Sequence, residues 1–214
     1  MAIYHFEFKN IKRSKGQTAT ASASYRSGSK IYDPQEEKYH DYTRKQDISH
    51  TEIILPDHAP QWATNREQLW NEVEKKDKRK DARPASEIIV ALPQELSKDQ
   101  QIELTKKFAK TNLSEKYNLA VDINLHDLDK QNPHAHIMMT TSMINENGLG
   151  KKNRDIQRKG VINNLRKQWE ESVNAALQEA GSDEKVDSRS LKEKGSDQIP
   201  QIHLGPHVIA MERK

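Results

Sequence analysis

The feature that most constrains the fold is a pair of short stretches that carry three histidines. In residues 121–126 (VDINLH), apolar and polar side chains alternate and His126 ends the run, which predicts a half-buried strand. After a seven-residue loop come His134 and His136, two residues apart, so their side chains project from the same face of a strand. The two stretches therefore predict an antiparallel hairpin with three imidazoles on one face.

Three imidazoles on one face form a candidate site for a divalent metal ion. Three protein ligands leave coordination positions open for water or substrate, whereas structural zinc sites use four. An open position favours chemistry on a phosphate or carbonyl group. The spacing of His126, His134 and His136 does not distinguish a zinc hydrolase from a manganese or magnesium nuclease. The other six histidines are not clustered in this way, and we interpret them as surface or structural residues.

The composition indicates a globular protein with a modest core. Of 214 residues, 33% are hydrophobic and 31% are charged, which favours one domain with long helices and solvated faces. The chain has no cysteine, so disulfides and thiolate metal sites are excluded. No apolar run is long enough to span a membrane, and the N-terminus lacks the pattern of a signal peptide. We therefore expect a cytoplasmic protein without membrane insertion.

Positive charge is concentrated in three segments. Residues 1–45 contain nine Lys or Arg and five Asp or Glu, residues 75–83 contain six and two, and residues 151–159 contain five and one. Each segment alone is typical of a solvated helix end or loop. Together with a site that acts on phosphate, they favour DNA or RNA as the partner, although the net charge is only +3.

The order of the predicted elements gives the fold class. We expect strands over residues 2–8, 51–55, 86–92 and the two histidine stretches, and helices over 17–32, 65–80, 161–180 and from Ser97 onward. This order predicts an α+β fold with an antiparallel-dominated central sheet, helices packed on one face and the histidine-bearing face left open. All of residues 1–214 would form a single domain, with a core over roughly 1–145 and a helical extension over roughly 151–214.

Two tyrosines and one glutamate are candidates for chemistry beside the histidines. Tyr25 projects from a predicted helix that otherwise consists of small residues, and such a helix can approach a nucleic-acid strand closely. Tyr32, seven residues later, would lie on about the same face. Alternatively, both tyrosines pack against the sheet. Glu87 begins a strongly apolar strand, where its carboxylate is either exposed at the strand end or directed toward the imidazoles.

Several motifs resemble those of MobA/MobL-type conjugative relaxases, in the same order. They are Met1-Ala2-Ile3-Tyr4-His5-Phe6, Gly16-Gln17-Thr18-Ala19 with Tyr25, Leu69-Trp70-Asn71-Glu72-Val73-Glu74, Glu87-Ile88-Ile89-Val90-Ala91-Leu92-Pro93, Asn132-Pro133-His134-Ala135-His136 and His203-Leu204-Gly205-Pro206-His207. Their joint order is highly specific and covers essentially the whole chain, whereas Asn-Pro-His-Ala-His alone is moderately specific. The family belongs to the HUH endonucleases, named for histidine-hydrophobe-histidine, and its active form is a single-tyrosine nickase of plasmid transfer origins.

The resemblance implies roles for individual residues within an HUH relaxase fold. It makes Tyr25 the nucleophile, and it makes His126, His134 and His136 the ligands of a divalent metal ion, Mn²⁺ or Mg²⁺. Glu87 would be either a base or a group that orients a ligand. Tyr32 does not match the catalytic position and is expected to be structural.

The implied function is to nick and rejoin one DNA strand at a plasmid origin of transfer through a 5′-phosphotyrosine intermediate. The implied partners are single-stranded or hairpin origin DNA, relaxosome accessory proteins and a conjugative coupling protein. The alternatives are a nuclease that uses water, a rolling-circle replication initiator, and a DNA-binding accessory module whose histidines hold a structural metal. Family members commonly continue into further domains, so we expect an excised relaxase domain or a short natural member.

Overall fold

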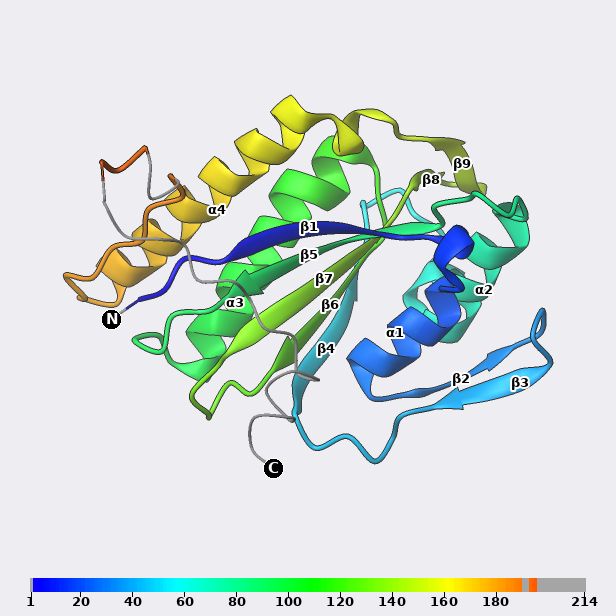
Figure 1. Ribbon diagram of the computed structural model, residues 1–214, viewed down its shortest axis with the longest axis horizontal. Helices are drawn as coiled ribbons and strands as arrows, with labels where there is room; N and C mark the ends of the chain where they lie inside the picture. The colour runs from blue at the N-terminus through cyan, green and yellow to red at the C-terminus, as the bar shows by residue number, and fades with distance from the viewer. Residues whose placement is uncertain (1, 190–192, 196–214) are drawn as a thin grey trace.

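The centre of the protein is a five-stranded antiparallel sheet. In this computed structural model, which describes residues 2–189 and 193–195, the strand order is β1-β5-β7-β6-β4 (Figure 1). The strands are β1 (Phe6–Ile11), β5 (Ala85–Ala91), β7 (His134–Thr140), β6 (Val121–His126) and β4 (Ile48–Ile54). The predicted antiparallel sheet is confirmed, and its two central strands are the histidine-bearing pair.

The predicted histidine hairpin is confirmed in register as well as in topology. β6 and β7 pair so that His126 lies opposite His134, and Asn124 lies opposite His136. On the other side of β7, Ile89 of β5 lies opposite His136, which places Glu87 on the same face as the histidines. The hairpin therefore sets the positions of the three histidines, and the pairing of β5 with β7 adds Glu87 to the same face.

Two helices cover the face of the sheet that faces away from the histidines. They are α3 (Lys98–Ala109), which continues as a π-helix over Lys110–Glu115, and α4 (Lys159–Glu179). Ser97, where a helix was expected to begin, caps α3 through a capping box with Gln100 as its second member. Phe108 and Trp169 meet edge to face at 5.0 Å in the larger apolar core, which α3 and α4 share with the sheet.

Two further helices, α1 (Ala19–Ser27) and α2 (Arg66–Lys76), lie on the histidine-bearing face (Figure 1). The last turn of α1 reaches the histidines, because the backbone oxygen of Arg26 lies 2.7 Å from His126 Nε2. Trp70 Nε1 donates to Asp122 on β6 at 2.9 Å, and Arg66 donates to both oxygens of the same carboxylate at 2.9 and 3.0 Å. The fold class is thus confirmed, but helices lie on both faces. The alternation in β6 suggested an open polar face, whereas Asp122 binds side chains of α2.

The helix predicted over residues 17–32 ends at Ser27, and this changes the place of Tyr32. Gly28 follows with φ of 60°, a left-handed conformation that stops a helix and favours glycine. A Cβ at Gly28 would lie 2.8 Å from Ile48 Cγ1, so the close approach of β4 also requires glycine here. Tyr32 lies in a strand, β2 (Lys30–Asp33), and does not share a helix face with Tyr25.

Several other boundaries also differ from the predictions. The expected loop over residues 33–50 contains a hairpin of β2 with β3 (Lys38–Asp41) and the start of β4. β1 begins four residues later than predicted and continues to Ile11. A second hairpin joins β8 (Ser142–Asn145) to β9 (Gly148–Lys152). Short 3₁₀ helices occupy Arg13–Lys15, Gln61–Thr64 and Asp155–Gln157.

The motif at residues 203–207 lies outside the described residues. Among the helices of the described ranges, none has the length and apolar character needed to cross a bilayer.

Candidate active site

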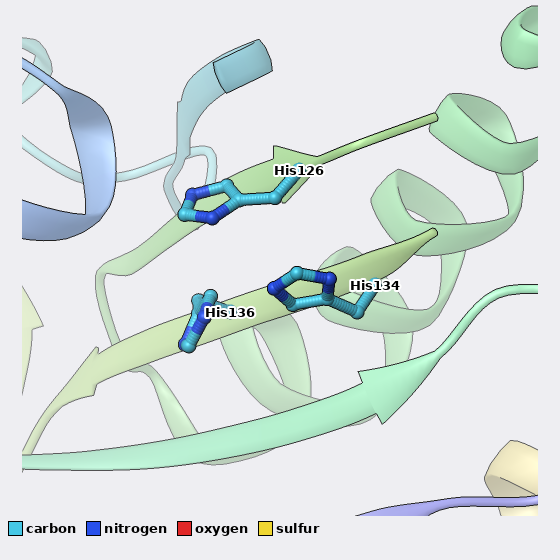
Figure 2. A group of neighbouring side chains, drawn as sticks. All are labelled: His126, His134 and His136. Carbon is cyan, nitrogen blue, oxygen red and sulfur yellow. The ribbon is translucent and has the colours of Figure 1, made fainter. Parts of the chain in front are cut away.

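The three histidines converge at one end of the β6–β7 hairpin. Figure 2 shows the His126 ring on one strand facing the His134 and His136 rings on its neighbour. The ring centroids lie 4.9 to 5.2 Å apart, and one potential ligand atom from each residue lies within 4.8 Å of the other two. This is the spacing needed for three imidazoles to share one ion, so the predicted cluster is formed.

Each imidazole has one ring nitrogen bonded to the surrounding protein. Nδ1 of His134 donates to the Asn132 backbone oxygen at 2.8 Å, and Nδ1 of His136 donates to Glu87 Oε1 at 2.7 Å. Nε2 of His126 donates to the Arg26 backbone oxygen at 2.7 Å. These bonds fix the ring orientations and leave Nδ1 of His126 and Nε2 of the other two as lone-pair donors, as in metal sites of this kind.

Burial keeps two of these imidazoles in the neutral form that binds metals. His126 is 2% exposed, and loss of hydration lowers its pKa to about 4, although the bond to the Arg26 oxygen opposes the change. Burial likewise lowers the pKa of His134. Because metal ions bind unprotonated imidazole, these two residues match the requirements of the site without losing a proton at neutral pH.

Glu87 is buried beneath the cluster and carries a negative charge. Arg26 donates to both of its oxygens, through Nε to Oε1 and through Nη2 to Oε2, the latter at 2.6 Å. Burial by itself would raise the pKa of Glu87, but the hydrogen bonds and positive charge from Arg26 and His136 lower it to about 2. The carboxylate is therefore directed toward the imidazoles and is not exposed at the strand end.

Tyr25 lies on the last turns of α1, next to the residue that contacts this cluster. Ala19 and Ala23 are fully buried, so the small residues of α1 let this helix pack closely against the protein core. Tyr25 itself is 49% exposed, and its ring meets the Tyr42 ring edge to face at 5.1 Å. The next residue, Arg26, contacts His126 through its backbone and Glu87 through its side chain. The nucleophile candidate and the histidine cluster are thus joined by one arginine.

Three residues around this site were not among the predicted ones. Arg26 could have been suspected, because it is the only long charged side chain in a helix of small residues. Lys45 and Asp47, which lie beside Tyr25 and His126 respectively, belong to an irregular loop in which periodicity carries no signal. Tyr32 lies elsewhere, with its ring 4.9 Å from that of Tyr39 in the β2–β3 hairpin.

A second group of potential ligands occurs in that hairpin, where Asp33, Glu36 and His40 approach one another. The Asp33 carboxylate already accepts bonds from the Thr20 hydroxyl and from the backbone of Gln35 and Glu36. Its oxygens close the turn, so this group is best explained as part of the hairpin structure.

Comparison with known proteins identifies the family to which this chain is similar. Residues 17–214 match the MobA/MobL family. Mobilization protein MobL of Acidithiobacillus ferridurans is 35% identical over 248 residues, and conjugal transfer protein TraA of Agrobacterium fabrum is 34% identical over 245. All of this chain is covered in both cases, but it spans 65% of the length of MobL and 22% of TraA.

Solved structures agree with the sequence relatives. A structure described as the molecular basis of vancomycin resistance transfer in Staphylococcus aureus is 36% identical, with a TM-score of 0.83, and the match covers 88% of this chain and 100% of that one. The conjugative relaxase TrwC, solved in complex with oriT DNA and metal, shares the fold at 10% identity and a TM-score of 0.53, covering 83% of this chain and 71% of that one. The chain therefore belongs to the MobA/MobL family.

Proposed function

We propose that this chain is a relaxase that nicks one DNA strand at a plasmid origin of transfer and later rejoins it. The observation that carries the proposal is the attachment of α1 to the histidine cluster through Arg26. It fixes the backbone next to Tyr25 relative to His126 and His136. Membership of a family of mobilization proteins supports the same conclusion.

The chemistry follows from the position of Tyr25. Its phenol oxygen attacks the scissile phosphate and loses its proton, while the 3′ oxygen of the preceding nucleotide departs and takes up a proton. The products are a 5′-phosphotyrosine and a free 3′-hydroxyl. Because a phosphodiester is exchanged for a phosphodiester, the 3′-hydroxyl can reverse the reaction and restore the strand. Holding the phenol in line with the phosphate supplies much of the rate enhancement.

His126, His134 and His136 would hold the divalent metal. When bound, that ion draws negative charge away from the scissile phosphate. Three imidazoles with outward hydrogen bonds form a donor set suited to a transition metal. Of the two ions expected from the sequence, Mg²⁺ fits poorly because it prefers oxygen ligands, so we propose Mn²⁺.

For Glu87 we propose the orienting role and not that of the base. Both carboxylate oxygens are engaged by Arg26, and one also accepts the bond from His136. With a pKa of about 2, the carboxylate is a weak proton acceptor at neutral pH. Its negative charge instead strengthens His136 as a ligand, in the manner of carboxylate–histidine–metal triads.

Two of the three basic segments supply a surface for DNA phosphates. Residues 75–83 and 151–159 meet at a hollow of about 570 Å³, where Lys152 Nζ contacts Asp77 at 2.7 Å. The cations that line this hollow are Lys76, Lys78, Arg79, Arg83, Lys152 and Arg154. The hollow includes Thr141, at the opposite end of β7 from His134, so bound DNA would span about 20 Å between them, given ~3.3 Å per strand residue.

We further propose that residues 1–214 act as one relaxase domain in the cytoplasm. The division expected from the sequence, a core over roughly 1–145 and a helical extension over roughly 151–214, remains a proposal. Relaxosome accessory proteins and a coupling protein are proposed partners, consistent with family relatives named for conjugal transfer.

The test is formation of a covalent protein–DNA adduct. Overlapping single-stranded oligonucleotides that tile the DNA flanking the gene for this chain, labelled at both ends, are incubated with the protein and Mn²⁺ and separated on a denaturing gel. We expect one oligonucleotide to yield a shifted band that retains only the 3′ label. Tyr25→Phe should bind the same oligonucleotide without forming the adduct, because ring packing remains while the attacking oxygen is lost.

Two of the alternatives, a nuclease that uses water and an accessory module, give different gels. Cleaved DNA without an adduct would indicate a nuclease that uses water. Binding of DNA without cleavage would indicate an accessory module. A phosphotyrosyl peptide identified by mass spectrometry at any position other than 25 would overturn the assignment of the nucleophile.

A further inference from the structure

A lysine from the loop between β3 and β4 contacts Tyr25 at two points. Lys45 Nζ lies 4.0 Å from the centroid of the Tyr25 ring and donates to the Tyr25 backbone oxygen at 3.2 Å. The Lys45 side chain is only 17% exposed, so most of its length packs against the protein. One cation therefore contacts both the ring and the main chain of the proposed nucleophile.

The same ammonium is tied to the histidine cluster through Asp47. Asp47 Oδ2 lies 3.3 Å from Lys45 Nζ and 3.5 Å from His126 Nδ1. The Asp47 backbone oxygen also accepts a bond from the Asp127 amide at 2.9 Å, which follows His126 directly in the chain. Lys45 is thus fixed relative to the end of β6.

These contacts restrict a side chain that would otherwise be free to move. The Tyr25 ring is half exposed, yet Tyr42 packs against it at an interplanar angle of 88° and Lys45 lies over its face. A cation over an aromatic ring is attracted to the negative face of the ring. This attraction, together with the packing of Tyr42, favours one ring orientation among the few that a tyrosine can adopt.

On the basis of the proposed nicking function, we propose that Lys45 is a positioning residue, which fixes the Tyr25 phenol for attack while Asp47 holds Lys45 beside His126. Misplacement of a reacting group by about 1 Å can reduce a rate by about 100-fold. A lysine that served only to stabilise the fold would not affect the chemical step at saturating DNA.

The protein contains a matched control for this contact. Lys30 Nζ lies 4.6 Å from the centroid of the Tyr39 ring and 3.8 Å from Asp41 Oδ2. It reproduces the cation, the aromatic ring and the nearby carboxylate, but its side chain is 51% exposed and its hairpin does not carry Tyr25. Replacement of either lysine by methionine removes the same charge and keeps a flexible apolar chain.

The experiment compares Lys45→Met, Lys45→Arg and Lys30→Met with the wild-type chain. Single-turnover adduct formation is measured against increasing concentrations of the oligonucleotide that the wild type attacks. We expect Lys45→Met to lower the rate constant at saturation by about 10- to 100-fold, with a small change in the half-saturating concentration. Lys45→Arg should recover most of the rate, because arginine also supplies a cation to an aromatic face. Lys30→Met should match the wild type.

A second measurement does not depend on nicking. In NMR spectra of protein labelled at tyrosine rings, Lys45→Met should shift the Tyr25 signals, and Lys30→Met should shift those of Tyr39. Circular dichroism checks that each variant is folded.

Each outcome decides the proposal. Equal saturating rates for Lys45→Met and Lys30→Met, or unchanged Tyr25 signals, would overturn it. An effect of Lys45→Met confined to the half-saturating concentration would also overturn it, because Lys45 would then be only a phosphate contact. If the wild type forms an adduct with none of the oligonucleotides, the proposed function fails, and the NMR comparison still shows whether Lys45 fixes the ring.

Discussion

Replacement of Glu87 by glutamine tests the buried network that links α1 to the histidines. The substitution removes the negative charge and keeps nearly the same shape. It leaves the Arg26 guanidinium, whose side chain is 15% exposed, without its anion. Removal of one partner from a buried ion pair costs about 3 to 5 kcal/mol, because the remaining charge stays buried and uncompensated.

The pKa of Glu87 gives an independent value for the stability that the substitution should remove. A fall in pKa from 4.5 to about 2 on folding means that the folded state stabilises the ionised carboxylate. At about 1.4 kcal/mol per pKa unit, this corresponds to roughly 3 kcal/mol. Because the folded pKa is the lower one, this stabilisation is complete above pH 4.5 and disappears as the pH falls toward 2. The two approaches agree on about 3 kcal/mol at pH 7.

The assay is urea unfolding followed by tryptophan fluorescence, in EDTA so that no metal contributes. Trp70 and Trp169 are both buried, one in the core on each side of the sheet, so the signal reports on the whole fold. The control is Glu72→Gln, which removes an exposed carboxylate 3.4 Å from Lys75 and should cost less than about 1 kcal/mol.

Two results would refute the reasoning about Glu87. The first is a loss of unfolding free energy at pH 7 that is no larger for Glu87→Gln than for Glu72→Gln. The second is a difference in unfolding free energy between wild type and Glu87→Gln that does not shrink between pH 4.5 and pH 2, where the protonated glutamate should resemble glutamine.

Three further predictions concern the site and the surface. His136→Ala should weaken Mn²⁺ binding by at least about 10-fold in isothermal titration calorimetry, whereas His50→Ala should not; equal affinities would exclude His136 as a ligand. Tyr32→Phe should keep most of the adduct-forming activity on a denaturing gel, and its loss would show that the β2–β3 hairpin takes part in the reaction. Affinity for the oligonucleotide, measured by fluorescence anisotropy, should fall steeply between low and physiological salt. A Lys78→Gln, Arg79→Gln double variant should show a weaker dependence of affinity on salt. Identical salt dependence for the variant and the wild type would show that these two side chains do not contact DNA phosphates.

The sequence predicted the histidine site well because that site depends on local geometry. Alternation in β6 and the two-residue spacing of His134 and His136 specify which side chains share a face, and a seven-residue loop allows the strands to pair. Register then follows, because a one-residue slip would place the histidines in the apolar core. For Glu87 the sequence left two alternatives open, exposure at the strand end or direction toward the imidazoles, and its bonds to His136 and Arg26 show the second.

The errors arose where distant contacts decide the structure. The helix over residues 17–32 was overextended because small residues tolerate a helix, whereas Gly28 ends it where Ile48 approaches too closely for a Cβ. The hairpin β2–β3 was missed because its strands are short and largely polar, so no hydrophobic period marks them. Helices on the histidine-bearing face were missed because Asp122 looked solvated, whereas it binds Trp70 of α2.

Arg26 shows why the complete site could not be assembled from the sequence alone. Its side chain meets Glu87, 61 residues away, and its backbone oxygen meets His126, 100 residues away. Neither separation follows from strand or helix periodicity, because α1 is placed by Gly28 and by its packing on α2 and the sheet. The backbone bond also has a consequence for mutagenesis: no side-chain substitution removes the oxygen that His126 contacts. Variants of Arg26 should therefore perturb Glu87 and His136 more than His126, and the attachment of α1 to the cluster should survive them in part.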